Sequence, residues 1–247
     1  MLAGILIKIG AYGLLRFSLV FFPDASQELC GLVYFISIVS IIYISLVAMA
    51  QQDMKKMIAY SSIAHMGFVT MGIFSLNSQA LKGAIFQMLS HGLISSALFI
   101  GIGTLYERMR SRKIADYGGM TSVMPAGAAF FMLFTISSIG LPGTAGFIGE
   151  FLVMLGVFRQ SKVYALLMLI GIVLGSVYML QLYRRIFFAK IRDEQRSENL
   201  VDLTRVEFVV LMLLGIIVVL LGIYPSPVLD LISAPVDDMD IFLMGQR

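Results

Sequence analysis

The chain has 247 residues, of which 59% are hydrophobic and only 13% are charged, whereas soluble domains carry about 25% charged residues. This composition excludes a soluble fold. The formal net charge of +3 does not indicate a nucleic-acid partner, because the basic residues lie in loops between apolar runs, where membrane topology places them.

Apolar runs of about 20 residues, each long enough to cross a bilayer, recur along the whole chain. They predict seven membrane helices, at 2–22, 29–50, 57–76, 82–106, 126–158, 163–189 and 206–224. Met1 leads directly into the first run, without the short core and cleavage site of a secretory signal. Because the connections leave no room for a soluble domain, we expect residues 1–247 to form a single transmembrane domain, an all-α, multi-pass helical bundle in the lipid bilayer.

Lysine and arginine are distributed unequally between the two sides of this predicted bundle. The loops at 51–56, 107–125 and 184–205 hold twelve of them, and the connections on the other side hold three. The positive-inside rule then predicts that the N-terminus and the basic loops face the cytoplasm or the mitochondrial matrix. The acidic C-terminal tail, with four aspartates between 230 and 240, falls on the opposite side.

The fifth run, 126–158, would be about 50 Å long as a continuous helix. Pro142 removes a backbone donor near its middle, and Gly143 permits a non-helical turn. We therefore expect one crossing made of two half-helices. A break of this kind either lines a hydrated path or binding site, or is a kink buried for packing, and the stretch alone favours neither interpretation.

Four ionisable residues lie well inside apolar runs: Lys8, His65, His91 and Glu150. An isolated charge near the bilayer centre costs roughly 2.5–3.5 kcal/mol, so such residues tend to face the bundle interior and to pair or carry protons. Each also has a simpler interpretation. Lys8 could extend to the basic interface, either histidine could be an interhelical hydrogen-bonded contact, and Glu150 could pair with a neighbouring basic group.

Together, these residue types suit proton relay. Imidazole titrates near neutrality and accepts and releases protons at different nitrogens, and desolvation makes a buried amine release its proton more readily. Ser61, Ser62 and Ser95 stand three or four residues from a histidine and are expected to extend a polar stripe on the same helix faces.

Other chemistries find little support in the sequence. A zinc site made of the two histidines and Glu150 would draw on three helices without HExxH spacing, so no metal site is expected. Cys30 is the only cysteine and cannot by itself hold an iron–sulfur cluster. No P-loop, GxSxG or dinucleotide fingerprint occurs in a strand-to-helix context. We therefore expect no catalytic residue, no bound cofactor and no redox centre in this chain.

Several segments resemble, in the same order, the antiporter-like membrane subunits of respiratory complex I. They are LAGILIKIGAYGLLR at 2–16, DMKKMIAYSSIAHMG at 53–67, QMLSHGLISS at 87–96, LYER at 105–108, GLPGT at 140–144 and GEF at 149–151. The resemblance covers essentially the whole chain. It points to the branch that holds chain M and mitochondrial subunit 4, with the Mrp cation/proton antiporters as close cousins.

The resemblance implies an antiporter-like fold of two inverted repeats, of which this chain holds the second repeat and flanking helices. It implies that Lys8 is the central connecting lysine, that His65 and His91 are relay histidines, and that Glu150 is the broken-helix carboxylate. The implied function is proton translocation as a non-redox subunit of NADH:quinone oxidoreductase. Quinone reduction elsewhere would shift the proton affinities of Lys8 and Glu150.

The same resemblance implies other membrane-arm subunits of complex I as partners, with NADH, FMN, iron–sulfur clusters and quinone bound by other subunits of the complex. The membrane would be the bacterial cell inner membrane or the mitochondrial inner membrane. The family's first repeat has no counterpart upstream of Met1, so a separate chain would supply it if the gene is split. An incomplete sequence or a degenerate paralogue would also explain why the first repeat is missing. Two other functions stay open: a subunit of a Mrp-type cation/proton antiporter, and a non-pumping structural remnant of the membrane arm.

Overall fold

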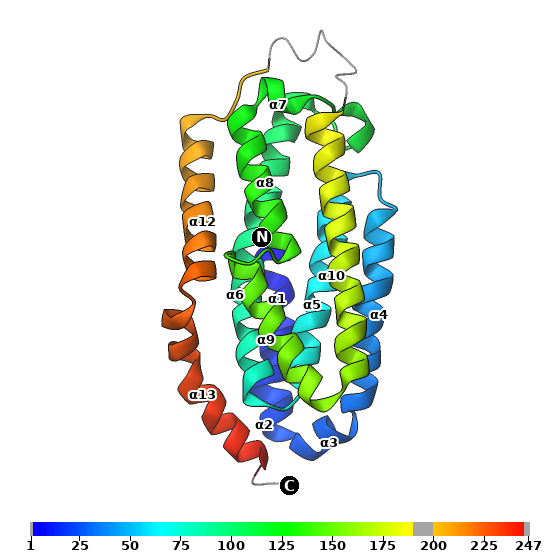
Figure 1. Ribbon diagram of the computed structural model, residues 1–247, viewed down its shortest axis with the longest axis vertical. Helices are drawn as coiled ribbons and strands as arrows, with labels where there is room; N and C mark the ends of the chain where they lie inside the picture. Colours follow the sequence, from blue (N-terminus) through cyan, green and yellow to red (C-terminus); the bar gives the residue numbers. More distant parts are fainter. Residues whose placement is uncertain (1, 190–199, 245–247) are drawn as a thin grey trace.

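The computed structural model describes residues 2–189 and 200–244. Over these residues the chain is helical and forms no sheet, and its helices stand side by side in an elongated bundle (Figure 1). The prediction of an all-α membrane bundle is confirmed. Among the described helices, six are long and apolar enough to span a membrane, and a shorter apolar helix covers Pro125–Ile139.

The first half of the chain forms a kinked rod and three long helices. Their bounds are η1 (Leu2–Leu6), α1 (Ile7–Gly13), η2 (Leu14–Ser18), α2 (Leu19–Phe21), α3 (Pro23–Glu28), α4 (Cys30–Met49), α5 (Met54–Phe74) and α6 (Ser78–Met109). The second half comprises η3 (Ile114–Asp116), α7 (Met120–Val123), α8 (Pro125–Ile139), α9 (Ala145–Gln160), α10 (Lys162–Tyr183), η4 (Arg184–Phe188), α12 (Arg205–Ile223) and α13 (Ser226–Met244).

Side-chain caps fix where three of the long helices begin. The Asp53 carboxylate accepts hydrogen bonds from the backbone of Lys55 and Lys56 at the start of α5. The Asn77 side chain accepts from the third residue of α6, and a capping box opens α12. Each cap satisfies backbone N–H groups that have no partner within the helix and contributes about 1 kcal/mol.

The predicted break in the fifth crossing is confirmed. α8 ends at Ile139, and α9 begins at Ala145 after a turn that contains Pro142. Gly140 has φ +80° and Gly143 has φ +92°, a backbone region that residues with a side chain rarely adopt. The two halves, about 22 and 24 Å long, follow one another through the bundle as a single crossing (Figure 1).

The first helix begins part-way along the bundle, below the level of the basic loops. Gly4 packs against Gly92 and Ser96, near the middle of α6, and the N-terminal end of the chain lies at mid-height of the bundle (Figure 1). Apolar composition shows that a segment lies in the membrane, but it does not fix the depth at which the segment starts.

The basic loops gather at one end of the bundle, as predicted. The backbone N–H of Met54 donates to the Arg112 carbonyl at 3.0 Å, and the backbone N–H of Ile114 donates to the Gln52 carbonyl at 2.9 Å. The 51–56 and 107–125 loops are therefore in contact. Thr121 donates to the Phe187 carbonyl at 2.8 Å and ties η4 to the same end. Three of the twelve basic residues counted above lie outside the described residues: Lys190, Arg192 and Arg196.

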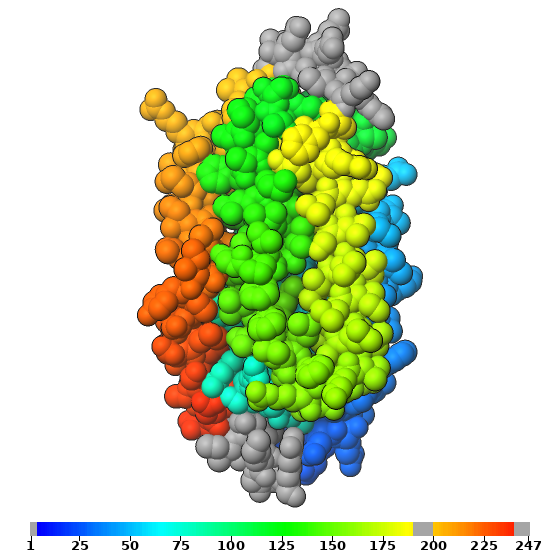
Figure 2. Space-filling model, viewed as in Figure 1, coloured from blue at the N-terminus to red at the C-terminus, as the bar shows by residue number. Residues whose placement is uncertain are grey.

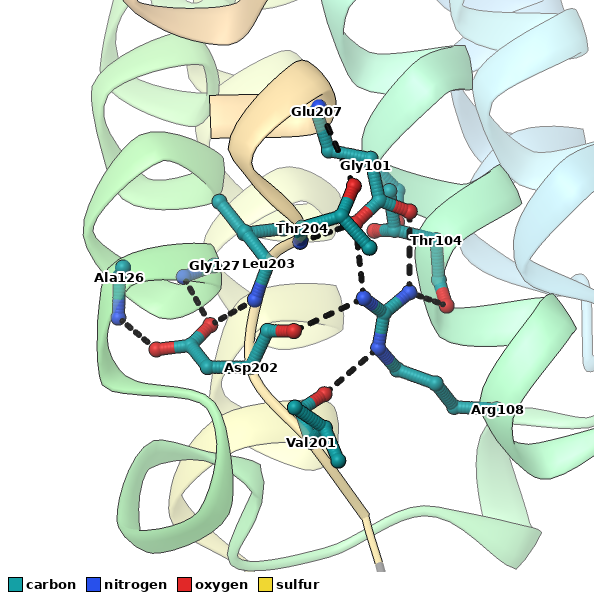
Figure 3. Close-up of polar contacts among 10 residues, drawn as sticks. All are labelled: Gly101, Thr104, Arg108, Ala126, Gly127, Val201, Asp202, Leu203, Thr204 and Glu207. Carbon is teal, nitrogen blue, oxygen red and sulfur yellow. Dashed lines mark hydrogen bonds and ion pairs between the residues drawn. The ribbon is translucent and has the colours of Figure 1, made fainter. Parts of the chain in front are cut away.

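Arg108, at the end of α6, fastens the segment that leads into α12 (Figure 3). Its guanidinium donates two hydrogen bonds to the Glu207 carboxylate, at 2.7 and 3.1 Å. It also donates to the backbone carbonyls of Val201, Asp202 and Thr104 at 2.7 to 2.9 Å. A planar guanidinium with five donors matches this set of acceptors, which an ammonium could not satisfy.

The Asp202 side chain extends this network to α8 (Figure 3). Its carboxylate accepts from the backbone N–H groups of Ala126 at 2.8 Å and Gly127 at 3.1 Å, in the first turn of α8. An anion is stabilised at a helix N-terminus by the free N–H groups and the helix dipole. The Arg108 network therefore holds the ends of α6, α8 and α12 together.

The predicted acidic tail contains a helix that the sequence pattern did not reveal. α13 runs on from α12 along one edge of the bundle (Figures 1 and 2). Val236 is buried, and Asp237 lies 2.8 Å from the Lys82 ammonium of α6. Pro235 and the aspartates disfavour a helix by propensity, but contact with α6 provides the stabilisation that an isolated segment would lack.

Candidate functional site

The structure brings the four ionisable residues singled out above into one row. Lys8 Nζ on α1 lies 2.7 Å from His91 Nδ1 on α6. The rings of His91 and His65, on α5, have centroids 5.3 Å apart. His65 Nδ1 lies 2.7 Å from Glu150 Oε1 on α9. Four residues separated by up to 142 positions in the sequence thus form a continuous line of titratable groups across the bundle.

This row is buried in the middle of the bundle. The exposed fraction is 8% for His65, 5% for His91 and 4% for Glu150, and Lys8 is half-buried. His65 lies roughly 17 Å along α5 and His91 roughly 20 Å along α6. A charged group at such depth is stable only when it is paired, and each member of the row has a partner within the row.

The simpler interpretations of the individual residues can now be compared with the geometry. Lys8 does not extend to the basic interface, because its ammonium group meets His91 inside the bundle. Glu150 contacts His65, so the simpler interpretation of Glu150, a pair with a neighbouring basic group, agrees with the structure. Glu150 is the sixth residue of α9, too far from the first turn for the helix end to be its main partner.

A second set of polar residues supports Glu150 and His65. Gln87 Nε2 donates to Glu150 Oε1 at 3.1 Å, and Ser90 donates to Gln87 Oε1 at 3.1 Å. Ser138 Oγ lies 3.4 Å from His65 Nε2. The sequence reasoning missed these residues, since glutamine and serine are common in helices. Their positions in the sequence could have indicated them, because Gln87 lies four residues before His91 and Ser138 lies beside the break.

Two small cavities flank the His65–Glu150 pair. One, of about 10 Å³, is lined by His65, Gln87, His91, Ser137, Ser138 and Glu150, among others. The other, also about 10 Å³, lies on the α10 side and is lined in part by Ser45, Gly175 and Tyr178. Each approaches the size needed for one water molecule with several polar partners. Small cavities therefore adjoin the pair on two sides.

The serine stripe expected from the sequence is only partly present. Ser61 and Ser62 both donate to the carbonyl of Ile58 within their own helix, at 2.8 and 3.1 Å, a common back-bonded arrangement. Ser95 is buried, and its hydroxyl has no hydrogen-bond partner among the described residues. The hydroxyl that contacts the row is instead that of Ser138, and Ser90 acts one step away through Gln87.

Glycines allow the helices that carry the row to approach closely. A side-chain carbon on Gly149 would meet Gln87 of α6. On Gly140, within the break, it would lie 3.2 Å from Glu150 Oε2. A side-chain carbon added at Gly143 would meet no neighbour within 4 Å. The break therefore lies beside the carboxylate through Gly140, at the level where α8 ends and α9 begins.

Over the described residues, no group of three or more histidine, cysteine, aspartate or glutamate side chains gathers in a way that could hold a metal ion. Cys30 is remote from the row, and its thiol donates to the Phe74 carbonyl at 3.1 Å. What the row can do chemically is bind protons and pass them between neighbours.

Comparison with known proteins places these features in a family. The family model described as NADH:quinone oxidoreductase/Mrp antiporter, TM, matches residues 1–175. The chain is 51% identical to NADH-quinone oxidoreductase subunit M of Rhodobacter capsulatus over 235 residues, which cover 95% of this chain and 46% of that protein. The chain thus spans about half the length of the curated relatives it matches.

Two solved structures share the fold. A chain in the structure of respiratory complex I from Thermus thermophilus with bound NADH matches with a TM-score of 0.87 and 27% identity, over 95% of this chain and 50% of that one. A chain of the Mrp complex from Dietzia sp. DQ12-45-1b matches with a TM-score of 0.87 and 17% identity, over 96% of this chain and 52% of that one. The chain belongs to the membrane-spanning family that NADH:quinone oxidoreductases and Mrp antiporters have in common.

Proposed function

We propose that this chain carries protons across the membrane as a non-redox subunit of respiratory NADH:quinone oxidoreductase. The observation that carries this proposal is the row from Lys8 through His91 and His65 to Glu150, in which both end contacts are 2.7 Å long. Proton transfer requires donor and acceptor within hydrogen-bond reach or joined by one water. The 51% identity to a subunit M supports the respiratory complex as the place where the row works.

The proposed path runs along the row. Lys8 and Glu150 hold protons at its two ends, and His91 and His65 pass them on, because imidazole can take up a proton at one nitrogen and release it from the other. Gln87 orients the Glu150 carboxylate through its amide donor. Quinone reduction elsewhere in the complex would act on the row through electrostatics, by changing the proton affinity of the end groups.

Other parts of the complex must supply what this chain lacks. NADH, FMN, iron–sulfur clusters and quinone would bind to other subunits, since one cysteine cannot ligate a cluster and the sequence has no dinucleotide fingerprint. Other membrane-arm subunits would be its neighbours, and helices corresponding to the rest of its relatives' length would come from a separate chain if the gene is split. The membrane would be the bacterial or the mitochondrial inner membrane.

Neutral replacements at the two ends test this function. Lys8→Met and Glu150→Gln keep side-chain size and remove the ability to hold a transferable charge. In membrane vesicles energised with NADH, we expect each variant to lower the number of protons pumped per NADH oxidised. Lys55→Met and Glu28→Gln, two exposed positions outside the row, are matched controls and should leave pumping at the wild-type value.

The outcomes separate the proposal from its alternatives. Unchanged pumping in both end variants would leave this chain a structural component of the membrane arm. Proton transport that runs without NADH and responds to the sodium gradient would instead place it in a Mrp-type antiporter, whose fold it shares.

A further inference from the structure

A cavity of about 390 Å³ opens at the basic end of the bundle, away from the buried row. Its lining residues come from three segments: Gln52, Lys113, Ile114, Ala115, Tyr117, Arg185 and Ala189. The volume falls within the range of small-molecule binding sites. This cavity therefore has the size of a binding site and contains two basic side chains, Lys113 and Arg185.

The walls of this basic cavity are held in place by hydrogen bonds. The backbone of Ile114 donates to the Gln52 carbonyl at 2.9 Å, so the 51–56 loop and η3 are joined. The Tyr117 hydroxyl donates to the Ser111 carbonyl at 2.7 Å. Fixed walls lower the entropy that binding must overcome, so the cavity is preorganised rather than formed by chance between loose loops.

The charges of the basic cavity, on Lys113 and Arg185, have no ion-pair partner among the described residues. Two nearby carboxylates are engaged elsewhere: Asp53 accepts from the backbone of α5, and Asp116 accepts from the Ser111 hydroxyl. Among the described residues, the cavity lining holds two cations and no acidic side chain, a combination that suits an anion.

The position of the basic cavity indicates where such an anion comes from. Arg185 lies just after α10, whose outer face exposes Val177 and Leu180, and Phe188, one turn further on, is 64% exposed. An apolar surface that ends at two cations matches the boundary between the acyl chains and the headgroups of a leaflet. The basic end is also the side on which anionic lipids produce a negative surface potential.

We propose that the basic cavity binds the phosphate headgroup of an anionic phospholipid from the leaflet at the basic end. Lys113 and Arg185 bind the phosphate, the Gln52 amide offers a further polar contact, and the acyl chains lie against the exposed apolar face of α10. This site is independent of proton transfer along the row, and neither cation belongs to the row.

The test measures lipid affinity of the chain in the complex purified from its native membrane. Labelled phosphatidylglycerol is titrated into zwitterionic detergent–phosphatidylcholine micelles that contain the protein. The double variant K113Q/R185Q is compared with K55Q/K56Q, which removes the same charge from the same end but outside the cavity. Each basic residue near an anionic surface contributes roughly a fivefold factor in affinity. We expect K113Q/R185Q to lose at least that factor and K55Q/K56Q to lose less than twofold.

A third variant separates the cavity from its charge. Ala115→Trp keeps both cations and places a large side chain at a position that lines the cavity, so it should also weaken binding if the headgroup enters the cavity. Equal losses in the two double variants, or no loss in K113Q/R185Q, would overturn the proposal, as would full binding by Ala115→Trp. Displacement of the lipid by inorganic phosphate at constant ionic strength would assign the cavity to free phosphate and overturn the lipid assignment.

Discussion

Removal of the Arg108 guanidinium should release α12 from the bundle. Arg108→Ala deletes both hydrogen bonds to Glu207 and three to backbone carbonyls, and leaves the Glu207 carboxylate with its own cap as its main partner. Loss of one partner of a buried ion pair costs about 3–5 kcal/mol. Because the two side chains are 12% and 17% exposed, solvent screening lowers this to about 2–4 kcal/mol.

The loss is measured most directly by hydrogen exchange along α12. A local cost of about 2–4 kcal/mol corresponds to a fall in protection of roughly 30- to 900-fold for amides that exchange by local opening. Arg108→Lys should lie between wild type and Arg108→Ala, because an ammonium cannot make the two-pronged contact. Arg205→Ala, at an exposed arginine in the first turn of α12, is the control. Equal protection in Arg108→Ala and Arg205→Ala would refute the role assigned to this network.

Three further predictions follow from the geometry. Gln87→Leu should slow proton transfer through the row by roughly tenfold or more, since a hydrogen bond to a charged group contributes about 1.5–3 kcal/mol. Gln79→Leu, at a glutamine on the same helix whose Oε1 has no hydrogen-bond partner among the described residues, should leave this rate unchanged. Gly149→Ala should destabilise the protein by about 1–2 kcal/mol in thermal unfolding, because crowding against Gln87 outweighs the gain in helix propensity. Gly10→Ala is the control: the added side chain would meet no neighbour within 4 Å, so this variant should be neutral or stabilising. Lys82 and Ser78 hold the pKa of Asp237 below its usual value of 3.8. The contact of α13 with α6 is therefore fully present above about pH 4, and it is lost as the pH falls through the lower pKa of the folded state. Hydrogen exchange of α13 in wild type and Asp237→Asn at matched pH should differ at neutral pH and converge in acid.

The sequence predicted the features that depend on local chemistry. Long apolar runs have few structures available to them in a membrane, because every backbone group must be paired internally. The helix positions and the break around Pro142 followed from that constraint. Lys8, His65, His91 and Glu150 could be singled out because each is costly at its depth unless paired, and the structure brings all four together.

Features that depend on how helices pack could not be predicted in the same way. The depth at which the first helix starts is set by the crossing of Gly4 with Gly92, a contact between residues that are uninformative on their own. Gln87 contributes to the row because Gly149 allows α9 to approach it. Helix α13 forms although its aspartates and Pro235 disfavour a helix, because Lys82 and buried Val236 hold it against the bundle.

The row contains one contact that differs from the others, and under the proposed function this contact is where proton transfer would be controlled. Lys8 meets His91, and His65 meets Glu150, at hydrogen-bond distance, whereas over the described structure no hydrogen bond joins the two imidazoles, whose centroids are 5.3 Å apart. A proton can cross this gap if a ring rotates or if a water enters the small cavity that both rings line. Because Glu150 also lines that cavity and lies beside Gly140 in the break, a small shift of α9 against α8 would change the space between the rings and the position of the carboxylate together. The broken helix would then gate the row without any change in its residues.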